Sequence, residues 1–150
     1  MSTETRIDLS QVRRRLAGEF GEAEKSYREA LVLWPGHSDA LYYLANCLWE
    51  EQRVPEALAV LDELVRGRPN ESRAWMQIGT ISLLRGERAE SDLARAERAF
   101  AEAHRINGEE SLPVVRLGVV AFLRGDLERA ETNFADALAL NASSVEAAWY

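Results

Sequence analysis

Alanine recurs along the chain in front of larger apolar residues, at the spacing of a helix face. Each alanine is followed four positions later by a larger residue and three positions after that by another small or apolar one. This spacing places the three side chains on one side of an α-helix. The sets are Ala23, Tyr27, Ala30; Ala57, Leu61, Leu64; Ala96, Phe100, Ala103; and Ala130, Phe134, Ala137. The pattern predicts an all-α chain.

A second apolar pattern lies between these segments. Its positions are spaced three, one and three apart, which again describes one helix face. The corresponding sets are Leu41, Leu44, Ala45, Leu48; Trp75, Ile78, Gly79, Ser82; and Val114, Leu117, Gly118, Ala121. The small members at Ala45, Gly79 and Gly118 are expected to let a partner helix approach closely. Because the two patterns alternate, the chain is predicted to form successive helical hairpins.

Turn-forming and capping residues separate the predicted helices. Tight turns within the hairpins are expected at Gly18, Gln52, Gly86 and Gly125. New helices are expected to begin with N-cap serines at Ser38, Ser72, Ser111 and Ser144. The first alanines of successive units are 34, 39 and 34 residues apart, so the hairpins repeat at a nearly constant period.

A helix–turn–helix unit of this length with these residues resembles the tetratricopeptide repeat (TPR). The resemblance covers four units, at residues 4–37, 38–71, 72–110 and 111–144, and residues 145–150 look like the start of a fifth. It implies a single TPR domain over residues 1–150, with the fold of an α-α superhelix built from antiparallel helical hairpins. The alternatives are a generic helical bundle, which would not require the period, and a coiled coil, whose seam the glycines would interrupt.

Two places depart from the repeat. The third unit has five extra residues, Glu87–Ser91, which are expected to form a surface insertion or a contact element beside the binding face; Ser91 or Asp92 is expected to cap the next helix. The first helix of the first unit has an unusual apolar set and is expected to act as a cap of the array. That set is Ile7, Leu9, Val12 and Leu16.

The resemblance also implies where a partner binds. In TPR arrays the first helix of each unit lines a concave groove that accepts a peptide or protein segment. The matching positions of this chain are Tyr42, Asn46, Trp49, Arg73, Met76, Thr80, Leu83, Val115, Val119 and Phe122. Leu84, Leu112 and Leu123 are instead expected to pack between neighbouring hairpins. Aromatic and methionine side chains favour a partner with apolar anchors.

A clamp for the carboxylate end of a chaperone tail, known from some TPR domains, is not favoured. Asn46, Arg73 and Gln77 supply parts of the required set. The lysine expected at the fifth position of a unit is absent, however, and without that cation the carboxylate loses a charge-assisted hydrogen bond. Tyr42, Met76 and Val115 occupy those positions.

Composition narrows the classes of partner. A formal net charge of −7 makes nucleic acid an unexpected partner, although the basic run at residues 13–15 forms either a solvated helix face or a local anion site. No segment has the apolar length of a membrane span or a signal peptide, so a cytoplasmic location without membrane partners is expected. The single cysteine, Cys47, is expected to be a buried small hydrophobe.

Nothing in the chain indicates a catalytic, metal or cofactor site. His37 and His104 do not have the spacing of metal ligands, and no phosphate-binding loop or nucleophile motif is present. His104 is expected to interact favourably with a helix C-terminus. The chain is therefore predicted to be a non-enzymatic interaction scaffold. The alternatives are a self-associating array, joined as a homo-oligomer through the uncapped C-terminal end at Trp149, and a regulatory domain of a larger enzyme.

Overall fold

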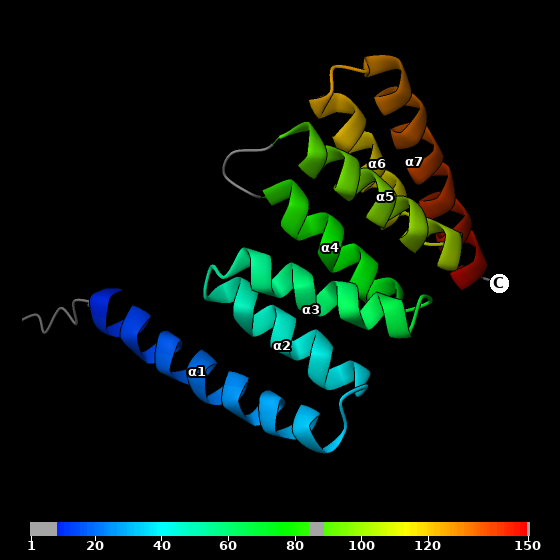
Figure 1. The fold of residues 1–150 in the computed structure, drawn as a ribbon. Coiled ribbons are helices and arrows are strands. Elements are labelled where there is room, and N and C mark those ends of the chain that lie inside the picture. Colours follow the sequence, from blue (N-terminus) through cyan, green and yellow to red (C-terminus); the bar gives the residue numbers. More distant parts are fainter. Residues whose placement is uncertain (1–8, 85–88, 150) are drawn as a thin grey trace, which may run out of the picture. The chain divides into compact units, whose positions relative to one another are not determined.

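The computed structural model describes residues 9–84 and 89–149, and for residues 9, 11–13, 15, 16 and 144–149 it describes the backbone alone. Every regular element in these ranges is a helix, so the all-α prediction is confirmed (Figure 1). The helices are α1 (Leu9–Leu33), α2 (Ser38–Glu50), α3 (Val54–Gly67), α4 (Ser72–Leu84), α5 (Glu90–Ile106), α6 (Leu112–Leu123) and α7 (Leu127–Trp149).

The chain forms two compact units, Met1–Asp62 and Glu63–Tyr150, whose boundary falls inside α3. In the first unit α1 packs along α2, and the Tyr27 and Tyr43 rings stack across the pair with centroids 5.8 Å apart. Four large buried side chains of this unit come from the positions that the repeat pattern marks as apolar: Leu41, Leu44, Leu48 and Leu61. Leu58, which lies outside that pattern, is buried as well.

The second unit contains two helical hairpins, α4–α5 and α6–α7, with α5 packed against α6 (Figure 1). One core cluster joins the hairpins. It consists of Leu83, Ala96, Phe100 and Val120, with Met76, Leu93, Leu117 and Val119 packed against it. Residues from α4, α5 and α6 thus share one core, which explains why the apolar positions of both sequence patterns recur together.

The small residues of the second pattern have the predicted role. A Cβ atom added to Gly79 would stand 2.5 Å from the Phe100 ring, and one added to Gly118 would stand 2.6 Å from the Phe134 ring. In each hairpin the aromatic ring of the second helix therefore lies directly on the backbone of the first. Only glycine leaves room for this contact.

Two of the predicted turns are confirmed by their backbone. Gly125 has φ 81° between α6 and α7, and Gln52 has φ 62° between α2 and α3. Both are left-handed conformations, which glycine adopts without strain and glutamine adopts at a cost. The third turn glycine, Gly86, lies outside the described residues.

The predicted turn at Gly18 is wrong, because α1 runs without interruption from Leu9 to Leu33. A glycine inside a helix costs only about 1 kcal/mol relative to alanine, which good helix formers on both sides offset. Nothing lies within 4 Å of a Cβ added at Gly18, so no neighbouring helix uses this glycine for close approach. The apolar residues of the expected cap helix lie in residues 1–8 or among those described by backbone alone.

The predicted serine caps are only partly correct. His37 rather than Ser38 caps α2, since its Nδ1 accepts the Ala40 N–H at 3.2 Å. Ser111 stands at the N-cap of α6 but makes no side-chain cap bond. The predicted start at Ser144 is wrong, because α7 continues as one helix to Trp149.

The hydroxyls of two of these serines bond instead to an asparagine of the same hairpin. Ser72, the first residue of α4, accepts a hydrogen bond of 2.9 Å from the Asn107 side chain after α5. The Ser111 hydroxyl donates to the Asn141 Oδ1 at 3.0 Å. Sequence alone does not reveal this use, because the asparagines that compete for the hydroxyls lie 30 or more residues away.

The start of α5 differs from expectation as well. Neither Ser91 nor Asp92 is the N-cap: Ala89 holds that position, and Glu90 and Ser91 lie in the first turn of the helix. The Asp92 carboxylate accepts the Ala89 N–H at 3.1 Å, which is the reciprocal half of a capping box. The remainder of the predicted insertion, residues 87 and 88, lies outside the described residues.

Candidate protein-binding surface

The predicted binding residues of the first unit lie on α2. Tyr42, Asn46 and Trp49 are all half-buried and are spaced four and three positions apart, so they share one helix face. We call these three residues the α2 face. The Tyr42 ring meets the Tyr43 ring edge-on, with centroids 5.5 Å apart. The Asn46 Oδ1 atom is buried and accepts no hydrogen bond from the described residues.

The candidates on α4 have different environments. Met76 and Thr80 are half-buried, and the Thr80 hydroxyl donates to the Met76 carbonyl at 2.8 Å. Arg73 is paired with Glu71, with 3.1 Å between Nε and the carboxylate. Leu83 is only 4% exposed and belongs to the core cluster, so its side chain supports the surface from within rather than meeting a partner.

The candidates on α6 range from half-buried to exposed. Val115 and Val119 are half-buried, and Val119 packs against the same core cluster as Met76 and Leu83. Phe122 is 58% exposed. The structure therefore brings Met76, Leu83 and Val119 together, while Phe122 lies on an open part of the hairpin.

The leucines expected between hairpins are exposed, so that prediction is wrong. Leu84, Leu112 and Leu123 are 60%, 50% and 38% exposed. Each stands at an end of its helix. The buried positions of α6 are Pro113, Val114, Gly118, Val120 and Ala121. A helical periodicity shows which face is apolar but not how far the neighbouring helix extends along it.

Comparison with known proteins links part of the chain to a sequence family. The tetratricopeptide repeat model matches residues 14–72. Residues 14–72 of the chain therefore match the tetratricopeptide repeat family. No curated protein sequence resembles the chain closely enough to count as a relative.

Solved structures share the TPR fold. MamA (residue 41 to the end) from Desulfovibrio magneticus RS-1 has a TM-score of 0.71 at 24% identity, over 84% of this chain and 68% of that one. Another crystal structure of MamA has a TM-score of 0.72 at 18% identity, over 89% and 75% of the chains. A thermophilic TPR protein from Thermus thermophilus has a TM-score of 0.65 at 26% identity, over 86% and 70%. The predicted α-α superhelix class is thereby confirmed.

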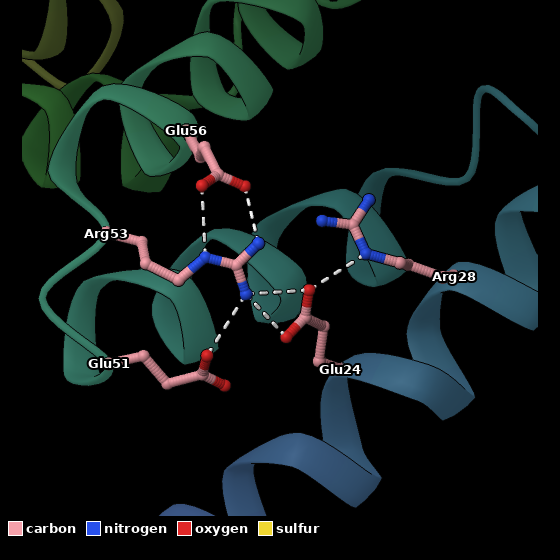
Figure 2. Close-up of polar contacts among 5 residues, drawn as sticks. All are labelled: Glu24, Arg28, Glu51, Arg53 and Glu56. Atoms are coloured by element: carbon pink, nitrogen blue, oxygen red, sulfur yellow. Dashed lines mark hydrogen bonds and ion pairs between the residues drawn. The ribbon is translucent and has the colours of Figure 1, made fainter.

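A cluster of ion pairs in the first unit was not predicted (Figure 2). Arg53, in the turn between α2 and α3, contacts three carboxylates: Glu24 at 2.8 Å, Glu51 at 3.1 Å and Glu56 at 2.5 Å. Arg28 also contacts Glu24, at 3.0 Å. The cluster ties α1 to the α2–α3 turn. Glu24 and Arg53 lie 29 positions apart, so no local sequence pattern indicates their contact.

The contacts of the cluster shift the pKa values of Glu24, Arg53 and Glu56. Burial raises the pKa of Glu24, but hydrogen bonds from Arg28 and Arg53 outweigh it, and the pKa lies below its ordinary value. The hydrogen bonds from Arg53 lower the pKa of Glu56. The pKa of Arg53 is raised by its bonds to Glu56, Glu51 and Glu24. All these groups are therefore charged at neutral pH and act as a structural tie.

Cys47 and His104 are the remaining polar residues that the sequence analysis singled out. Cys47 is buried as predicted, and burial, followed by the nearby Glu51, Glu24 and Glu50, raises the pKa of its thiol. His104 lies in the last turn of α5, with a buried Nδ1 that has no described partner. Within residues 9–84 and 89–149, no group of three metal-ligating side chains comes together, and no helix is long and apolar enough to cross a membrane.

Proposed function

We propose that the chain is a protein-interaction scaffold that binds a peptide segment of a partner through the α2 face. The observation that carries the proposal is the Asn46 Oδ1 atom, which is buried and lacks a hydrogen-bond donor among the described residues. A buried acceptor without a donor costs about 1–3 kcal/mol. A backbone N–H of a bound peptide would supply that donor.

The neighbouring residues suit the same ligand. Tyr42 and Trp49 flank Asn46 on the helix face, and rigid aromatic side chains supply large contact area at a low entropic cost. An asparagine side chain both donates and accepts, so it can pair with the N–H and the C=O of one peptide unit. The α2 face therefore suits an extended segment with apolar side chains on both sides of a recognised peptide bond.

The remaining candidates lie in the second unit, which we propose offers a binding surface of its own. Met76 and Thr80 on α4, with Val115 and Val119 on α6, offer half-buried apolar or weakly polar positions. Arg73 contributes less as a carboxylate receptor, because Glu71 already pairs with it. We therefore propose an apolar peptide segment rather than a charged tail as the ligand. Absence of catalytic activity and a cytoplasmic location are part of the same proposal.

The test is retention of partners from the native lysate by the full chain and by the Tyr42→Ala/Trp49→Ala double variant. We expect a partner to be retained by the wild type and lost by the variant, with circular dichroism showing equal helix content. Trp34→Ala is the matched control, because this tryptophan is 61% exposed and lies outside the α2 face. Equal retention by all three proteins would refute the proposal.

A photo-crosslinking residue separates direct contact from an indirect effect. Placed at Asn46, it is expected to capture the same partner that the double variant loses. Placed at Ala59, an exposed residue of α3, it is expected to capture none. Capture from Ala59 alone would move the binding surface to α3.

A further inference from the structure

The repeat positions of α1 are less buried than the same positions of the other units. In α3, α5 and α7 the small residues of the alanine pattern are at most 3% exposed; they are Ala57, Ala96, Ala103, Ala130 and Ala137. Their counterparts in α1, Ala23 and Ala30, are only half-buried, and so is Tyr27 between them. We call Ala23, Tyr27 and Ala30 the α1 stripe.

The difference follows from the helix that precedes each of these helices. α7 has α6 packed against it and no helix after it among the described residues, yet Ala130 and Ala137 are buried. α1 has α2 packed against it, but the residues before Ala23, from Leu9 onward, continue α1 itself. The α1 stripe therefore lacks, among the described residues, the first helix of a hairpin.

The N-terminal part of α1 carries the apolar pattern that such a helix needs. Leu9, Val12 and Leu16 are three and four positions apart, whereas the α1 stripe has spacings of four and three. Each set lies along one face of a helix. Because the two orders are mirror images, an antiparallel helix pair brings the sets into register. The opposed residues are Leu16 and Ala23, Val12 and Tyr27, and Leu9 and Ala30.

A straight helix cannot bring its own two halves together. α1 is continuous from Leu9 to Leu33, and a rise of about 1.5 Å per residue places Val12 and Tyr27 about 22 Å apart along its axis. The residues that match the α1 stripe must therefore come from α1 of another molecule. In a two-fold symmetric pair each helix both supplies and receives the same contacts.

The charges of α1 favour the same antiparallel arrangement. Residues 9–17 contain three arginines and no carboxylate, whereas residues 19–29 contain four glutamates, one lysine and one arginine. An antiparallel pair sets the basic part of one helix beside the acidic part of the other. The register brings Arg15 of one copy close to Glu22 of the other. Glu22 is exposed and lies about 200° around the helix from Glu24, so this contact leaves the Arg53 cluster undisturbed.

We propose that the α1 helices of two copies of this chain pair in antiparallel orientation, each covering the α1 stripe of the other with Leu9, Val12 and Leu16. The occupant is a second copy because this chain supplies both the apolar spacing that matches the α1 stripe and the complementary charge. The two-fold symmetry repeats every contact, so two Arg15–Glu22 pairs flank one apolar seam. The proposal does not depend on the α2 face.

Sedimentation equilibrium of the full chain measures the pairing. The wild type is expected to form a dimer whose dissociation constant rises about tenfold in Leu16→Ser, because apolar contact is lost twice. Arg15→Glu is expected to weaken the dimer about tenfold as well, and Arg15→Glu/Glu22→Arg to restore the wild-type value. A wild type that stays monomeric up to about 1 mM overturns the proposal, as does a double variant no tighter than Arg15→Glu.

Matched variants control for apolar area and charge. Val32→Ser removes an 81% exposed aliphatic side chain of α1 outside the α1 stripe, and Glu128→Arg reverses an exposed carboxylate of α7. Both variants are expected to dimerise as the wild type does. A dimer that Leu16→Ser weakens no more than Val32→Ser would place the interface elsewhere and overturn the proposal.

Spin labels distinguish pairing between copies from folding back within one chain. Cysteines replace Ser10 and Glu29, which are opposed in the antiparallel register, in a Cys47→Ala background. A doubly labelled chain diluted in unlabelled chain is expected to keep the straight-helix separation of about 29 Å. A mixture of chains labelled at one site each is expected to give a separation below about 20 Å. A short distance in the diluted sample, or none in the mixture, overturns the proposal.

Discussion

The Phe100 ring lies so close to Gly79 that a methyl group at Gly79 would stand 2.5 Å from it. Both residues are buried, and the ring is in the shared core of α4, α5 and α6. We expect Gly79→Ala to destabilise the chain by about 2 kcal/mol, because the ring and its neighbours must shift in a close-packed core. Urea denaturation followed by circular dichroism measures the change.

Gly18→Ala is the matched control for that substitution. Gly18 is exposed within α1, with nothing within 4 Å of an added Cβ. Alanine there is expected to stabilise the chain by about 1 kcal/mol through helix propensity. Equal effects of the two substitutions would show that close approach at Gly79 does not limit the hairpin.

Substitutions at the two left-handed turn residues are expected to change the free energy of unfolding in opposite directions. Gln52 has φ 62° and Gly125 has φ 81°. Gln52→Gly is expected to stabilise the chain by roughly 0.5 kcal/mol, because relief of backbone strain exceeds the added entropy of the unfolded chain. Gly125→Ala is expected to destabilise it by roughly 1 kcal/mol. Thermal unfolding of both variants checks the signs, and a loss of stability in Gln52→Gly would contradict this account.

Stability should depend on pH through the Arg53 cluster. The pKa values of Glu24 and Glu56 are lowered in the folded chain. A glutamate whose pKa is lower in the folded chain stabilises the fold fully at pH values above its pKa in the unfolded chain, about 4.3. This stabilisation is lost as the pH falls through the pKa of the folded chain. The difference in unfolding free energy between wild type and Arg53→Ala should therefore be larger at pH 7 than at pH 3.

Denaturation at those two pH values is the measurement for the Arg53 prediction. Arg66→Ala provides the control, because Arg66 is exposed on α3 and lies outside the cluster. Its effect on stability should change little between the two conditions. An Arg53→Ala effect that is the same at both pH values would show that the carboxylates titrate independently of the arginine.

The Cys47 thiol should react slowly in the native chain. It is 7% exposed, and burial raises its pKa, so both access and the thiolate fraction are reduced. We expect an aromatic disulfide reagent to modify it on the order of 100-fold more slowly than in the urea-unfolded chain. Equal rates would mean that the first unit opens on the time scale of the reaction.

Much of the fold follows from local pattern. The alanine–aromatic spacing places Ala96 and Phe100 on one face of α5, and that face is the buried one. The turn at Gly125 depends on short-range sterics, whereas the small residue at Gly79 was predicted from its place in the repeat and meets Phe100 of another helix. Gly18 shows the limit: a glycine permits a turn, but whether the helix ends there depends on what the flanking segments can pack against.

The candidate site is less predictable. The repeat assigned Asn46 to a binding face. It could not predict that the Asn46 Oδ1 atom is buried, because that burial depends on the neighbours of Asn46 in the folded unit. Leu83 has the same sequence position as exposed Phe122 within its hairpin, yet it is buried because α6 covers it. Sequence periodicity describes a helix face, whereas exposure depends on the next element in space.

The amino-acid sequence by itself determined the repeating helical hairpin, because a helix face and a turn arise from residues close in the chain. Only the tertiary structure decided which equivalent positions of the repeats have different contacts. Glu24 and Glu97 are paired with arginines from 29 and 27 positions away, while Glu131, in the same place of the repeat, has no such partner among the described residues. That difference depends on which hairpin packs next, and long-range packing rather than local propensity decides it.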